Sequence, residues 1–138
     1  MSYAGDITPS QAWELLRDNP AAVLIDVRTE AEWRFVGVPD TGSIDRPTAL
    51  IEWVDGTGSP NPRFAEQLSN ALAGRDPAAP VVFLCRSGQR SAHAAGVATD
   101  LGINPAYNVI DGFEGPLDAE GRRGGAGWRA EGLPWRQS

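Results

Sequence analysis

One stretch of the chain decides its fold: Val81-Val82-Phe83-Leu84-Cys85-Arg86-Ser87-Gly88-Gln89-Arg90-Ser91. Its first five residues are continuously apolar, which predicts a strand buried on both faces of a sheet. A short polar loop follows, and Gly88 permits a tight turn there. The alanine-rich segment from Ser91 to Leu101 then predicts a helix, which Gly102 ends. A buried strand that feeds a helix through a short loop is typical of α/β proteins.

The loop after this strand carries the chemistry. Cys85 stands at the carboxyl end of the strand, where open α/β sheets place their ligand sites. Backbone N–H groups of the loop and the start of the helix can together form a nest for an anion. Arg86 and Arg90 add positive charge, which favours a thiolate over a thiol. A lone cysteine is usually a small buried hydrophobe, but this setting predicts a nucleophile for an anionic substrate.

The remainder of the chain alternates between helix and strand patterns. Capping patterns at Thr8 and Thr29 predict two helix starts, and Asn61-Pro62 predicts a third. Strands are expected at 21–25, near Ser43 to Asp45, at 81–85 and at 107–110. The alternation predicts an α/β fold with a central five-stranded parallel sheet and helices on both faces.

Composition excludes several classes of function. Twelve basic and eighteen acidic residues give a net charge of −6, which argues against a nucleic-acid partner. All twelve basic residues are arginines, so lysine Schiff-base and Walker-type phosphate chemistry are excluded. The apolar runs are too short to span a membrane. One cysteine precludes an internal disulfide, which fits the cytoplasm, and a single histidine beside it argues against structural zinc. The length predicts one domain over 1–138.

Three motifs in order resemble those of the rhodanese-like sulfurtransferases. They are Val23-Leu24-Ile25-Asp26-Val27-Arg28 with Glu32-Trp33, the loop from Cys85 to Ser91, and Gly112-Phe113-Glu114-Gly115 with Gly127-Trp128 and Gly132-Leu133-Pro134. The resemblance implies a persulfide on Cys85, with a substrate site formed by Arg86, Ser87, Gly88, Gln89, Arg90 and Ser91. It also implies a small anionic donor such as thiosulfate, and cyanide, a thiol or a protein as the acceptor. No metal or organic cofactor is required, and no pattern sets an oligomeric state.

The chain departs from the family pattern at two places. Where the family has Gly-His-Ile-Pro-Gly-Ala, this chain has Gly37-Val38-Pro39-Asp40-Thr41-Gly42, so no role is transferred to that segment. Eleven extra residues, Pro116 to Ala126, separate Gly115 from Gly127, and we interpret them as a loop insertion at the surface.

Two other classes of function stay open. A phosphatase or arsenate reductase would use a similar cysteine loop, but such loops place arginine six positions after the cysteine. Here Ser91 holds that position and the arginine is Arg90. A non-catalytic interaction module would not need the cysteine.

Three polar residues outside the loop are assigned structural roles. Asp26 and Arg28 are interpreted as a scaffold pair, with Arg28 reaching Glu32. His93 is expected to be carried away from Cys85 by its helix.

Overall fold

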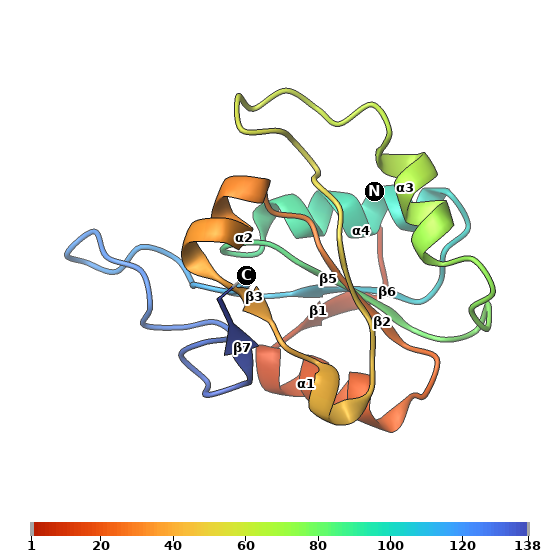
Figure 1. Cartoon of the computed structure of the whole chain (residues 1–138), viewed down its shortest axis with the longest axis horizontal. Helices are drawn as coiled ribbons and strands as arrows, with labels where there is room; N and C mark the ends of the chain where they lie inside the picture. Colours follow the sequence, from red (N-terminus) through yellow and green to blue (C-terminus); the bar gives the residue numbers. More distant parts are fainter. Residues whose placement is uncertain (1, 138) are drawn as a thin grey trace.

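The computed structural model describes residues 2–137, which form a five-stranded parallel sheet with helices on both faces (Figure 1). The strand order is β1-β6-β5-β2-β4, so β5, which ends just before Cys85, is central. The strands are β1 (Gly5–Ile7), β2 (Val23–Asp26), β4 (Thr48–Leu50), β5 (Val81–Leu84) and β6 (Ala106–Val109). The helices are α1 (Pro9–Asp18), α2 (Glu30–Val36), α3 (Phe64–Ala71) and α4 (Gln89–Asp100). The predicted fold class is confirmed.

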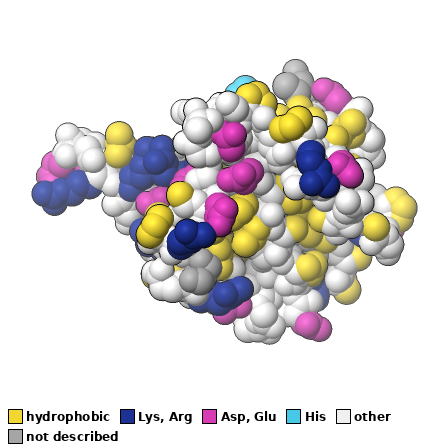
Figure 2. Space-filling view, turned by 45° about the horizontal axis from the view of Figure 1, so that its top comes forward, with side chains coloured by type: hydrophobic (Ala, Val, Ile, Leu, Met, Phe, Trp, Pro, Cys, Tyr) yellow, Lys and Arg dark blue, Asp and Glu magenta, His cyan; other side chains and the backbone are white. Residues whose placement is uncertain are grey.

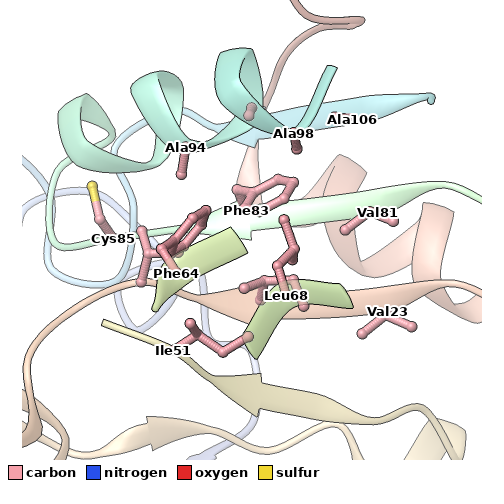
Figure 3. Packing of buried hydrophobic residues seen from close by; sticks show 13 residues of the cluster. Val23, Ile51, Phe64, Leu68, Val81, Phe83, Cys85, Ala94, Ala98 and Ala106 are labelled. Carbon is pink, nitrogen blue, oxygen red and sulfur yellow. The ribbon is translucent and has the colours of Figure 1, made fainter. Parts of the chain in front are cut away.

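Alternation along the strands divides the core into two clusters. Val81 and Phe83 face the side covered by α3 and α4, and Cys85 continues that side (Figure 3). Val82 and Leu84 face the opposite side, where α1 contributes its buried residues, Ala12 and Leu16 among them, to the second cluster. The β5 strand is buried on both faces, as its continuous apolar run predicted.

The sequence misplaced one strand and missed another. The strand expected near Ser43 to Asp45 is wrong: Gly42–Ile44 forms a 3₁₀ turn and the strand is β4, five residues later. Thr48–Leu50 forms a strand because it pairs with β2, and this long-range pairing cannot be seen in the local sequence. The missed strand is β1, three residues whose ordering comes from pairing with β6 a hundred residues away.

The third helix starts later than its capping pattern predicted. Arg63, not Asn61, is the N-cap residue of α3, and the Asn61 Oδ1 accepts a hydrogen bond from the Arg63 backbone N–H at 3.0 Å. That contact forms a turn ahead of the helix, which begins at Phe64. The two starts at Thr8 and Thr29 are confirmed as complete capping boxes.

The C-terminal region packs on the α1 side of the sheet, where Trp128 belongs to the second cluster. A two-residue strand β7 (Trp135–Arg136) pairs antiparallel with β3 (Val38–Pro39). Residues 116–126 contain no helix or strand and are mostly exposed, and this arm projects from the body of the protein in Figures 1 and 2. Its base is narrow, since a Cβ on Gly115 would lie 2.6 Å from the Ala126 carbonyl oxygen.

No helix among residues 2–137 is long and apolar enough to cross a membrane. The same residues contain no group of three or more His, Cys, Asp or Glu side chains that could hold a metal ion.

Candidate active site

Cys85 lies where the central strand meets helix α4. The strand ends at Leu84 and the helix starts at Gln89, so the loop between them has only four residues. Gly88 is the residue before the helix and has φ +101°, a conformation that side chains other than glycine's rarely adopt. The thiol therefore sits beside the positive end of a helix of twelve residues.

Two donors contact the sulfur directly. The Gly88 backbone N–H donates to Cys85 Sγ at 3.1 Å, and the Ser91 hydroxyl lies 3.2 Å from the same atom. Cys85 is 1% exposed and Ser91 is fully buried. Both contacts can stabilise negative charge on sulfur.

Two carbonyl groups of the loop accept hydrogen bonds from the turn that follows β6. The Phe113 backbone N–H donates to the Cys85 carbonyl at 2.8 Å, and the Glu114 N–H donates to the Arg86 carbonyl at 3.0 Å. In a trans peptide the N–H points opposite to the carbonyl. The N–H groups of Arg86 and Ser87 therefore point away from residues 113–114, which leaves them free for an anion.

The two loop arginines differ in their surroundings. Arg86 is exposed, and within residues 2–137 its guanidinium forms no ion pair. Arg90 forms a bidentate ion pair with Glu32 of α2, at 2.7 and 2.9 Å. The Arg90 fork is therefore occupied, and it ties α4 to α2.

Asp26 and Arg28 form a buried pair on the other face of the sheet. Arg28 donates from Nη2 to Asp26 Oδ2 at 2.7 Å and to the Gly37 carbonyl at 2.8 Å. Its guanidinium also lies 4.2 Å from the centre of the Phe113 ring. The expected contact from Arg28 to Glu32 is wrong, because Arg28 forms its ion pair with Asp26 and Glu32 forms its ion pair with Arg90. His93 is exposed on α4, and within residues 2–137 it forms no hydrogen bond with the thiol.

Asn108 was not among the site residues predicted from the sequence, and its side chain continues the hydrogen bonds behind Cys85. Its Oδ1 lies 2.5 Å from the Ser91 hydroxyl, and its Nδ2 donates to Asp6 and to the Gly88 carbonyl. The available signal was a polar residue inside the apolar strand 107–110. Asp6 could not be found this way, since β1 was not predicted.

A cavity of about 490 Å³ lies on the far side of this polar network. Its walls come from the start of β1, the loop, the outer face of α4 and the end of β6; the polar groups among them include Asp6, Asn108 and Asp111. Cys85 does not line it; the thiol is linked to it by the Gly88 N–H, which contacts Sγ, and by Ser91, which bonds to Asn108.

Acid should weaken the tie between α2 and α4. Burial alone would raise the pKa of Glu32, but hydrogen bonds and charge attraction from Arg90, with hydrogen bonds from Thr29, lower that pKa from 4.5 to about 2. A lowered pKa in the folded state means that Glu32 stabilises the fold above pH 4.5, and that this stabilisation disappears as the pH falls toward 2. We expect Glu32→Gln to reduce stability at pH 7 and to flatten its decline between pH 5 and 2, measured by urea unfolding. A variant with the wild-type pH dependence would contradict this account.

The family model and the similar proteins point to the same family. The family model for the rhodanese-like domain matches residues 8–118. The crystal structure of Rv0390 from M. tuberculosis is 64% identical, with a TM-score of 0.91, and the match covers 99% of this chain and 100% of that one. The thiosulfate sulfurtransferase GlpE of Glaesserella parasuis is 30% identical over 115 residues, 83% of this chain and 88% of that relative. The solution structure of a polysulfide-sulfur transferase homodimer from Wolinella succinogenes is 28% identical, with a TM-score of 0.63, over 95% of this chain and 77% of that one.

Proposed function

Because the chain belongs to the rhodanese-like domain family, whose relatives include sulfurtransferases, we propose that it transfers sulfane sulfur through a persulfide on Cys85. The observation that carries the proposal is the position of Cys85 Sγ at the end of β5, in contact with the Gly88 N–H and the Ser91 hydroxyl. The Gly88 N–H favours the thiolate, which is the nucleophilic form of cysteine, and the Ser91 hydroxyl adds to this when its proton faces the sulfur.

The proposed reaction has two displacement steps. The Cys85 thiolate attacks the outer sulfur of thiosulfate, the S–S bond of the donor breaks, and sulfite leaves with the bonding electron pair. The persulfide then lies within the loop amides. Cyanide, a small thiol or a protein thiol attacks its outer sulfur, and Cys85 leaves as the thiolate. The scheme requires no cofactor, and a lone cysteine that must stay reduced fits the cytoplasm.

The loop geometry supports sulfur transfer over phosphoryl transfer. Ser91, not arginine, stands six positions after the cysteine, and its hydroxyl contacts Sγ. The arginine one position earlier is engaged by Glu32. Because phosphoryl transfer depends mostly on positioning charge around three oxygens, this loop suits a single transferred sulfur better.

Intact mass tests the proposal. Incubation with thiosulfate should add the mass of one sulfur atom, and cyanide should remove it with release of thiocyanate. Hydrolysis of aryl phosphates should be negligible. Cys85-dependent phosphatase turnover would favour the phosphatase alternative, and the absence of both adduct and turnover would favour an interaction module.

Removal of the two loop arginines should have unequal effects. We propose that exposed Arg86 holds the sulfonate end of the donor, whereas Arg90, paired with Glu32, braces the loop. Loss of a charge-assisted contact costs about 1.5–3 kcal/mol, so Arg86→Ala should lower kcat/KM for thiosulfate roughly 10- to 150-fold. Arg90→Ala should instead reduce the free energy of unfolding. If both variants keep the wild-type kcat/KM, the backbone amides alone bind the donor.

A further inference from the structure

Three buried polar groups form a continuous chain behind the sulfur. Cys85 Sγ lies 3.2 Å from Ser91 Oγ, which lies 2.5 Å from Asn108 Oδ1. Each of these three residues is at most 3% exposed. Asn108 belongs to β6, the strand beside β5, and no step of the proposed reaction uses it. The hydrogen bond between Ser91 and the sulfur therefore depends on Asn108, a residue outside the loop.

The amide of Asn108 is fixed in one orientation. Its Nδ2 lies 3.0 Å from Asp6 Oδ1 and 3.1 Å from the Gly88 carbonyl oxygen. A backbone carbonyl can only accept, and an ionised carboxylate can only accept. The NH₂ group must therefore face these two partners, so the Asn108 carbonyl oxygen must face Ser91. The Tyr3 hydroxyl donates to Asp6 at 2.7 Å, at the outer end of the chain.

Ser91 has one hydroxyl proton and two neighbours that can accept it. When Cys85 is a thiol, its S–H can donate to Ser91 Oγ, and Ser91 can donate to Asn108, so every contact is satisfied. When Cys85 is a thiolate, its sulfur can only accept. Ser91 can then donate to Sγ only by giving up its bond to Asn108, which leaves the Ser91 and Asn108 oxygens facing each other 2.5 Å apart without a proton between them.

We propose that Asn108 is a positioning residue that draws the Ser91 proton away from Cys85 and so holds the resting sulfur in its thiol form. Asn108 opposes the effect of the Gly88 N–H and the helix end, which favour the thiolate. The balance between these two influences sets how much thiolate is present before a donor binds.

The role of Asn108 in catalysis rests on the proposed function, because it concerns the persulfide on Cys85. In a persulfide the inner sulfur carries no proton, and the negative charge lies mainly on the outer sulfur. Ser91 can then keep its bond to Asn108 at no cost to the inner sulfur. Asn108 therefore favours the loaded state over the free thiolate, the form in which Cys85 leaves when the acceptor takes the sulfur.

Other charged groups lie near the loop and are left unchanged in the test. Arg86 and Arg90 lie on the loop and the first turn of α4, Glu32 lies on α2, and Asp26 ends β2. Asp111 follows β6, and its backbone nitrogen lies close to Gly88. Their influence is common to all variants, so it cancels in the comparison.

The test measures how the alkylation of Cys85 by iodoacetamide depends on pH. Cys85 is the single cysteine of the chain, so every adduct detected by intact mass reports on it. Asn108→Ala should lower the midpoint of the pH profile by about 0.4 to 1 unit, the effect of one hydrogen bond. Ser91→Ala should raise the midpoint. Asn108→Val removes the same acceptor while filling the space, and it serves if the alanine variant does not fold.

The double variant distinguishes positioning from a general loss of structure. If Asn108 acts through Ser91 and not through its bond to the Gly88 carbonyl, Asn108→Ala should leave the midpoint unchanged when Ser91 is already alanine. Tyr3→Phe removes the outermost contact and should leave the midpoint at its wild-type value. An equal shift in both Ser91 backgrounds, a shift of the same size in Tyr3→Phe, or no downward shift would overturn the proposal. Alkylation needs no sulfur donor, so this result is separate from whether the protein takes up sulfur from thiosulfate.

Discussion

Replacement of Cys85 by serine should abolish both the sulfur adduct and the production of thiocyanate. A serine hydroxyl is far less acidic than a thiol, and it cannot form a persulfide. The chain has no other thiol that could take over the transfer. The expected loss is complete, measured as intact mass after incubation with thiosulfate and as thiocyanate released on addition of cyanide.

The same variant should retain its fold, because serine is close to cysteine in size and can still accept from the Gly88 N–H. Circular dichroism and thermal unfolding provide this control. Thiocyanate formation at the wild-type rate by a folded Cys85→Ser protein would exclude Cys85 as the nucleophile.

Gly112→Ala should be the most damaging substitution outside the loop itself. Gly112 has φ +54°, and a Cβ there would lie 2.6 Å from the Arg86 carbonyl carbon and 2.7 Å from its oxygen. These are backbone atoms of the active-site loop, so no side chain can move aside to make room. Overpacking and the left-handed conformation together should cost about 2–5 kcal/mol, which lowers Tm by roughly 7–17 °C. Sulfur loading should fall as well, because the loop must shift.

Gly102→Ala is the matched control. Gly102 also has a positive φ, +88°, but a Cβ there would meet no atom within 4 Å. It carries the conformational cost without the collision, so its Tm should lie between those of the wild type and Gly112→Ala. Equal Tm values for the two variants would show that the collision with the loop contributes nothing.

Local sequence patterns were enough to predict the fold class, the central strand and the position of the thiol at its end. These follow from local patterns: a continuous apolar run, capping boxes at Thr8 and Thr29, and glycine at the turn before α4. Such patterns act within a few residues, so they are legible without knowledge of the rest of the chain. Candidate site residues Cys85 to Ser91 were legible for the same reason, because they are contiguous.

The hydrogen-bond and ion-pair partners of those residues depend on the tertiary structure. Arg90 pairs with Glu32, 58 positions away, and Asn108 bonds to Asp6, 102 positions away. Glu32 pairs with Arg90 and not with Arg28. The reason is side-chain alternation, which places Asp26 and Arg28 on the face of the sheet opposite Cys85. The short strands β1 and β4 were likewise fixed by pairing with β6 and β2. Long-range pairing leaves no local pattern, because its free energy comes from contacts that exist only once the sheet has assembled.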